Sequence, residues 1–105
     1  MNDNREVLTT LFQILQKSRD LPSPYLMTLI IVSLQPGISV NDLSAALNVP
    51  QQTASRYAGV LLGRYSEIPS VDKPFLRQTI SEDDPRKRAL HLTKFGENYL
   101  KKIFE

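Results

Sequence analysis

The chain contains no cysteine and no tryptophan, and His91 is its only histidine. The absence of thiols excludes disulfides and thiolate metal sites, and this composition suits a reducing cytosol. A single histidine without a histidine or cysteine partner disfavours a metal site. The lack of cysteine excludes a Cys/His pair, and Ser39 is expected to cap a helix rather than act as a nucleophile, because no histidine lies near it in the sequence. We therefore expect no metal, no other cofactor and no enzyme active site.

Long hydrophobic runs are also lacking. The longest apolar stretch, Tyr25 to Leu34, is interrupted by Thr28 and Ser33 and falls short of the ~20 residues that a membrane-spanning helix needs. Residues 1–6 mix acidic and basic side chains and lack the apolar centre of an export signal. We expect no membrane segment, no export and a cytoplasmic location.

Neither sign of charge is in large excess, because 13 basic and 11 acidic residues give a formal charge of +2. A length of 105 residues suits one compact domain, residues 1–105, without a separate ligand-sensing domain. Residues 1–50 hold three basic and four acidic side chains, whereas residues 51–105 hold ten and seven. The second half is therefore the half that can meet a polyanion.

Helical periodicity predicts two helices in the first third of the chain. Residues 1–20 form the first helix, with an apolar stripe of Val7, Leu8, Leu11, Phe12 and Leu15. Pro22 and Pro24 then break the chain, and Ser23 is the expected N-cap of a second helix that ends near Leu34. Because this second helix is the most apolar, we expect it at the centre of the core.

A helix-turn-helix is predicted over residues 39–63. Ser39 followed by Asp42 has the form of a capping box and opens a short helix. Its expected buried edge is Leu43, Ala46 and Leu47. Residues 48–50 are predicted to form a tight turn, and a second helix then runs from Pro50 or Gln51 to Leu62, where Gly63 ends it.

A β-hairpin and a last helix complete the prediction. Residues 64–74 show no clear period and contain two prolines, so they are interpreted as a connecting loop. Residues 75–93 form the hairpin, with strands at 75–80 and 89–92 and a charged tip. Thr93 caps a helix over 93–105 whose apolar face is Phe95, Tyr99, Leu100, Ile103 and Phe104. The expected fold class is mainly α with a small β-hairpin (α+β), a winged helix-turn-helix.

The second helix of the pair has two chemically different faces. At about 100° per residue, one side gathers Ala54, Tyr57, Ala58, Leu61 and Tyr65, and the opposite side presents Gln52, Arg56 and Gly59. No carboxylate lies between Asp42 and Glu67. Amide, hydroxyl and guanidinium groups without an acid suit the base edges and phosphates of a major groove. The candidate DNA contacts on this helix are Gln51, Gln52, Thr53, Ser55 and Arg56.

Three segments resemble the MarR family of bacterial transcription regulators. They are Thr53-Ala54-Ser55-Arg56, Asp84-Pro85-Arg86 and Leu92-Thr93-Lys94-Phe95-Gly96, which are similar to that family's T-x-S-R recognition-helix start, its D-x-R wing and its L-T-x-x-G helix start. The match covers residues 38–100 and implies a dimeric prokaryotic repressor or activator on a palindromic operator. The segment from Arg64 to Pro74 is longer than the family's usual connection, and the helices that dimerise the family are expected to be shorter here.

The resemblance also implies roles for the hairpin tip. Arg86 is expected to reach a phosphate or the minor groove, with Asp84 orienting it through an ion pair. Lys87 and Arg88 can add phosphate contacts, and strand alternation, which sends one of them to the other side, favours Lys87. The candidate contacts of the wing are therefore Asp84, Arg86, Lys87 and Arg88. Arg64, Lys73 and Arg77 are weaker candidates.

These observations predict that the chain binds double-stranded DNA in a sequence-specific way. The favoured interpretation is a dimeric transcriptional repressor. A two-fold dimer presents two recognition helices about 34 Å apart. The apolar stripes of the first and last helices together also provide more apolar surface than the three short central helices need to cover. We therefore expect a homodimer through the N- and C-terminal helices. The alternatives are a DNA-binding factor of a partition or recombination complex and a winged-helix protein-interaction module. Whether a small-molecule effector binds is left open.

Overall fold

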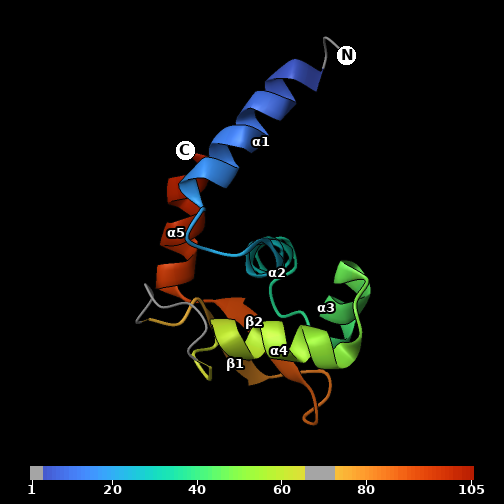
Figure 1. Ribbon diagram of the computed structural model, residues 1–105. Coiled ribbons are helices and arrows are strands. Elements are labelled where there is room, and N and C mark those ends of the chain that lie inside the picture. The colour runs from blue at the N-terminus through green and yellow to red at the C-terminus, as the bar shows by residue number, and fades with distance from the viewer. Residues whose placement is uncertain (1–3, 66–72) are drawn as a thin grey trace.

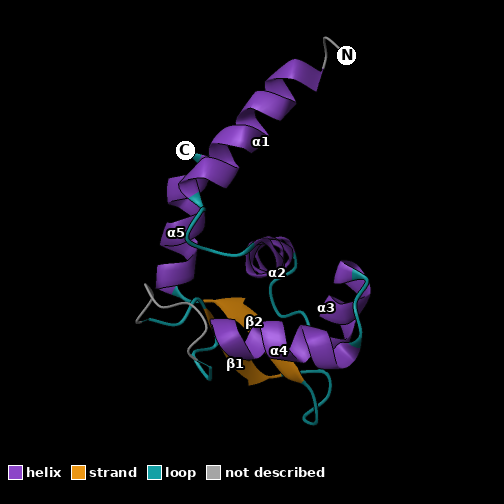
Figure 2. Ribbon diagram, viewed as in Figure 1, coloured by secondary structure: helices purple, strands orange, loops and turns teal. Residues whose placement is uncertain are grey.

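The computed structural model describes residues 4–65 and 73–105. The elements run in the order α1 (Arg5–Lys17), α2 (Ser23–Leu34), α3 (Val40–Leu47), α4 (Gln51–Leu61), β1 (Leu76–Ile80), β2 (Arg88–Leu92) and α5 (Lys94–Phe104). Helices dominate, and within residues 4–65 and 73–105 the two strands form one antiparallel hairpin (Figure 2), whose β2 contacts α2, α3 and α5. The predicted α+β winged-helix architecture is confirmed. Of the predicted loop over 64–74, residues 66–72 lie outside the described residues.

Helix α2 occupies the centre of the molecule, as predicted. It contacts α3, α4, α5 and β2 and is seen end-on between the other elements in Figure 1. The hydroxyl of Thr28 is buried there and donates a hydrogen bond to the Pro24 carbonyl, 2.8 Å away. The prediction that Ser23 caps α2 is wrong. The helix begins one residue earlier than expected, so Pro22 takes the cap position and no side chain caps the helix.

Strand β2 forms hydrogen bonds on both of its edges, to β1 on one side and to the segment before α3 on the other. Leu76 pairs with Leu92 and Ile80 with Arg88 across the two strands. On its other edge Leu90 bridges to the segment before α3, because Gly37 donates to the Leu90 carbonyl (2.8 Å) and Leu90 donates to the Ile38 carbonyl (2.9 Å). These bonds fix the wing beside the first turn of α3.

The first turn of α5 packs against the residues that lead into β1. The Thr93 hydroxyl accepts a hydrogen bond from the Gly96 backbone N–H (3.0 Å), which confirms the predicted cap. Gly96 packs directly on the backbone of Phe75, and a Cβ at that position would overlap the Phe75 carbonyl oxygen. The buried Phe75 ring packs against the rings of Phe95 and Tyr99, with centroids 5.0 Å and 5.2 Å away.

Helix α1 projects away from the body and meets α5 near its own C-terminal end (Figure 1). The Tyr99 hydroxyl donates to the Asp20 carboxylate (3.1 Å) and ties α5 to the turn after α1. Burial of Tyr99, and then the hydrogen bond and charge of Asp20, raise the pKa of Tyr99, so this donor stays protonated.

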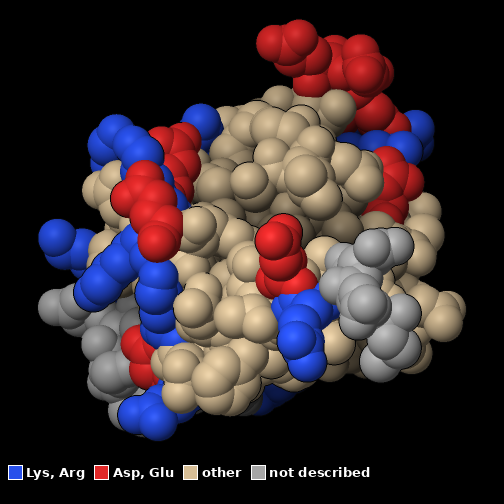
Figure 3. Space-filling view, turned by 90° about the horizontal axis from the view of Figure 1, so that it is seen from above, with Lys and Arg blue, Asp and Glu red and all other residues tan. Residues whose placement is uncertain are grey.

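None of the 13 residues of α1 is buried. Its apolar stripe is between 47% and 64% exposed, and consists of Val7, Leu8, Leu11, Phe12 and Leu15. Viewed from the α1 side, the molecule has a broad uncharged area with most charged side chains toward its edges (Figure 3). Within residues 4–65 and 73–105, no helix combines the length and apolar character required to cross a membrane.

Candidate nucleic-acid interface

The turn between α3 and α4 is encoded locally. The Ser39 hydroxyl accepts the Asp42 backbone N–H at 3.1 Å and starts α3. Asn48 ends it in the left-handed conformation with φ of 56°, which asparagine tolerates better than most residues. The Val49 N–H then bonds to the Ser44 carbonyl (3.1 Å), and Pro50 leads directly into α4. The predicted helix-turn-helix is therefore present with a turn that its own residues hold.

Helix α4 separates a buried side from an exposed polar side. Ala54, Ala58 and Leu61 are buried, and the half-buried Tyr57 packs edge-on against Tyr25 at 5.6 Å. The candidate contacts lie on the remaining surface, where Gln51, Gln52, Ser55 and Arg56 are exposed and Thr53 is half-buried. All five predicted side chains of this helix are thus open to solvent at least in part.

Two predicted placements in the helix-turn-helix are wrong, the burial of Ala46 and the position of Tyr65 on the Ala54 side of the second helix. Ala46 is exposed, because the short α3 meets α2 and α4 along a narrow edge on which Leu43 is its only fully buried residue. Tyr65 is 48% exposed and does not continue the core side of α4. The helix ends at Leu61, so helical phase no longer applies at Tyr65, and its ring lies over Gly59 on the outer side.

The wing tip is organised by Asp84 and Arg86. One Asp84 carboxylate oxygen accepts the Arg86 backbone N–H (3.0 Å) and the Arg86 Nε–H (3.3 Å). The backbone hydrogen bond, then the side-chain bond, and the nearby charge of Lys87 hold the pKa of Asp84 below its usual range. The Arg86 side chain remains 91% exposed. The pair therefore orients a guanidinium that stays accessible to a ligand.

The wing and the helix-turn-helix enclose one open hollow of about 500 Å³. Its described lining contains three cations and no carboxylate, and consists of Ser39, Val40, Asn41, Gln51, Arg86, Lys87 and Arg88. The sequence missed Ser39, Val40 and Asn41 as part of this surface, because their place beside the wing depends on the bridge between Ile38 and Leu90.

Strand alternation does not separate Lys87 from Arg88, contrary to the prediction. Strand β2 begins only at Arg88, so Lys87 belongs to the turn, and both side chains line the same hollow. The remaining candidates Gln52, Thr53, Ser55 and Arg56 lie farther along α4, outside that lining. The structure thus brings the wing cations together with the first residue of α4 and leaves the rest of the helix face as a separate exposed strip.

No protein-family model and no curated protein sequence matches this chain, but solved structures do. The transcriptional regulator Tm0710 from Thermotoga maritima is 20% identical with a TM-score of 0.75, over 97% of this chain and 68% of that one. MarR from E. coli is 13% identical with a TM-score of 0.69, over 91% and 66%. The transcriptional repressor CouR, bound to a 23-mer DNA duplex, is 19% identical with a TM-score of 0.65, over 95% and 66%.

The fold is the MarR-type winged helix. The expected resemblance is confirmed at the level of the fold, which is what identities of 13–20% can establish. This chain spans 66% of the length of the MarR and CouR chains, so about a third of each of those neighbours has no counterpart in it.

Four of the residues behind the MarR-like resemblance make contacts that shape the fold. Thr93 caps α5, and Gly96 lets that helix approach the Phe75 backbone. Asp84 and Arg86 shape the wing tip. The Thr93 and Gly96 motif therefore holds α5 against the entry of β1, and the Asp84 and Arg86 motif orders the wing tip.

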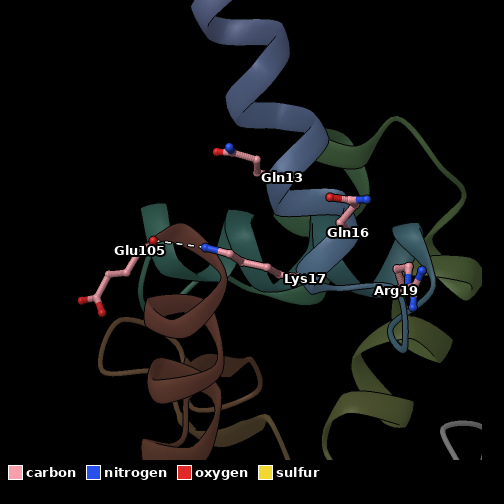
Figure 4. A pocket seen from close by; sticks show the side chains of 5 residues that line it. All are labelled: Gln13, Gln16, Lys17, Arg19 and Glu105. Atoms are coloured by element: carbon pink, nitrogen blue, oxygen red, sulfur yellow. Dashed lines mark hydrogen bonds between the residues drawn. The ribbon is translucent and has the colours of Figure 1, made fainter.

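A second hollow lies where α1 meets the end of α5 (Figure 4). Lys17 Nζ donates to the Glu105 backbone carbonyl at 3.1 Å, and the other lining side chains are Gln13, Gln16 and Arg19. All five are exposed, so no buried polar group is directed at a ligand. Among the described residues, no group of three His, Cys, Asp or Glu side chains could hold a metal ion.

Proposed function

We propose that this chain is a sequence-specific double-stranded DNA-binding transcriptional regulator, with α4 in the major groove and the wing on the backbone or minor groove. The observation that carries the proposal is the basic hollow in which Arg86, Lys87 and Arg88 meet Gln51. A major groove admits a helix, and the phosphates that border it are neutralised by such cations. The neighbour CouR, which has the same fold, is bound to a DNA duplex.

The exposed strip of α4 supplies the groups that would read bases. Gln52 and Arg56 are one helical turn apart and exposed, and their side chains match the bidentate pairing of Gln with adenine and Arg with guanine. Gln51, Thr53 and Ser55 flank them with amide and hydroxyl groups suited to phosphate and base edges. Because α4 contains no acidic residue, nothing on this helix repels the phosphates.

The proposal includes a homodimer in which residues 1–105 act as one winged helix-turn-helix unit. The apolar stripe of α1 is exposed in the single chain, and α1 meets α5 only near its own C-terminal end, so the stripe is available for a second copy to bury. A two-fold dimer would present two α4 helices to successive major grooves, about 34 Å apart. We propose that such a dimer acts as a prokaryotic repressor in the cytoplasm.

A salt series tests the proposed function. Binding of the purified chain is measured on a random duplex and on the promoter upstream of its own gene. Several phosphate contacts predict that log affinity falls with log salt by about 0.9 per contact, and regulation predicts promoter binding at least ~10³-fold tighter than random DNA. Weak attraction to both duplexes that salt abolishes would contradict the proposal and favour the protein-interaction module. Equal tight binding to both would favour a non-regulatory DNA-organising factor.

A further inference from the structure

The end of α4 is shaped as a Schellman motif that turns the chain back over the helix. Gly63 adopts φ of +86°, a conformation that glycine reaches without the steric cost of a Cβ. Its N–H bonds to the Val60 carbonyl (3.0 Å), and the Arg64 N–H bonds to the Gly59 carbonyl (2.9 Å). The next residue, Tyr65, is thereby directed toward the helix surface at Gly59 and away from the core.

The ring of Tyr65 rests on Gly59 because that residue has no side chain. A Cβ built on Gly59 would lie 2.6 Å from Tyr65 Cε2 and 3.2 Å from Cδ2, so any other residue would displace the ring. Gly59 is buried although it is on the outer side of α4. The ring of Tyr65 therefore occupies the space on the surface of α4 that a side chain at position 59 would fill.

Arg56 lies over the same ring, with its guanidinium carbon 5.1 Å from the ring centroid. Arg56 precedes Gly59 by three residues, so both lie on the same side of α4. A cation over an aromatic face at this distance is attracted to it. The contact restricts a long side chain that the proposed function assigns to the DNA.

From this arrangement we infer that Tyr65 is a positioning residue, which holds the Arg56 guanidinium in place for DNA through a stack of Gly59, the Tyr65 ring and Arg56. The inference rests on the proposed function, since it assigns a DNA-binding role to Arg56. Ordering the guanidinium before binding reduces the conformational entropy that is lost on binding. The attraction needs the ring and not its hydroxyl group.

The test measures affinity for a duplex that the wild-type chain selects from a random-sequence pool. Tyr65→Ala is expected to weaken binding roughly two- to five-fold, the range of an exposed cation–π contact, whereas Tyr65→Phe retains wild-type affinity. Gly59→Ala displaces the ring while keeping both Arg56 and Tyr65, and is expected to weaken binding like Tyr65→Ala. Because alanine favours a helix more than glycine does, the melting temperature of the Gly59→Ala variant should stay the same or rise. A loss of affinity in this variant is then not caused by unfolding.

A double-mutant cycle distinguishes positioning from direct contact. In an Arg56→Ala background, Tyr65→Ala is expected to cause no further loss of affinity, and a loss that persists there would show that Tyr65 touches DNA itself and overturn the inference. An NMR measurement without DNA adds a second readout, because the Arg56 Nε–H proton should show a ring-current shift in wild type and Tyr65→Phe but not in Gly59→Ala. If that shift is absent in wild type, the inference is wrong.

Failure of the inference and failure of the proposed function give different results. If the wild-type chain selects no duplex, the proposed function is wrong, and the role of Tyr65 falls with it. If the wild-type chain binds its selected duplex and Tyr65→Ala binds it equally well, only the role of Tyr65 is overturned.

Discussion

The Thr93 hydroxyl donates a 2.7 Å hydrogen bond to the backbone carbonyl of Pro74, which lies 19 residues earlier. The same oxygen accepts the Gly96 N–H at 3.0 Å, and the Thr93 N–H donates to the Phe75 carbonyl at 2.9 Å. One residue therefore joins the entry of β1, the exit of β2 and the first turn of α5. The position of the wing depends on this junction.

Thr93→Ala is expected to destabilise the protein by about 1 to 2 kcal/mol, the cost of losing a helix cap, and Thr93→Ser is expected to recover most of that loss. The matched control is Ser23→Ala, which removes a hydroxyl from the first turn of α2, where no side chain caps the helix. Urea unfolding measures both. Equal losses at Thr93 and Ser23 would contradict the assigned caps.

Gly96→Ala is expected to destabilise the fold by about 1 to 3 kcal/mol, the usual cost of overpacking. The added Cβ would overlap the Phe75 carbonyl oxygen, and backbone cannot move aside cheaply. Gly59→Ala is the control, because the atoms in its way belong to the exposed, movable ring of Tyr65. Thermal unfolding should show a lowered midpoint for Gly96→Ala alone, and a lowered midpoint for both would mean that helix glycines matter here for another reason.

The pKa of Asp84 is lowered in the folded wing, so its contribution to wing order is fully present above the usual carboxyl pKa of about 3.9. It is lost as the pH falls through the folded pKa. We expect the Arg86 amide signal to stay constant from neutral pH down to that range and to move only below it. Arg86→Ala should raise the pKa of Asp84 only part of the way, because the backbone N–H, the larger cause, remains. A full return to the usual value would show that the side chain is the main cause.

Arg86→Ala is expected to reduce the salt dependence of DNA binding by about 0.9 in the slope of log affinity, if its charge lies against phosphate. Arg77→Ala provides a matched control, because Arg77 is also exposed on the hairpin but pairs opposite His91 and does not line the basic hollow. Its slope should remain that of wild type. Equal reductions for both arginines would indicate a diffuse charge effect and not a contact at the hollow.

Leu11→Lys combined with Phe12→Lys is expected to convert a dimer to a folded monomer. The two side chains are 48% and 60% exposed, so their loss should leave the melting behaviour of the single chain unchanged while placing charge in the proposed interface. Ile80→Lys, at a site 61% exposed on β1, should leave the dimer intact. Sedimentation at micromolar concentration measures the oligomeric state of the wild-type chain and of both variants. A monomeric wild-type chain would contradict the proposed dimer.

Sequence alone was sufficient for features that depend on neighbouring residues. Helical periodicity located each helix of the described residues to within a few residues. The caps at Ser39 and Thr93 were predicted correctly because each bonds to an N–H three residues later. The wing pair of Asp84 and Arg86 is equally local. Its prediction came from the family resemblance.

Tertiary structure decided the features that depend on residues distant in the sequence. The basic hollow exists because Leu90 bridges to Ile38 and sets the wing beside α3, a pairing that no periodicity encodes. Helical phase extended beyond Leu61 predicts Tyr65 on the same side as Ala54 and Leu61, whereas the turn at Gly63 reverses the chain and places the ring on Gly59. Local sequence determines the order of elements through short-range hydrogen bonds. The binding surface is decided by long-range packing, which brings those elements together.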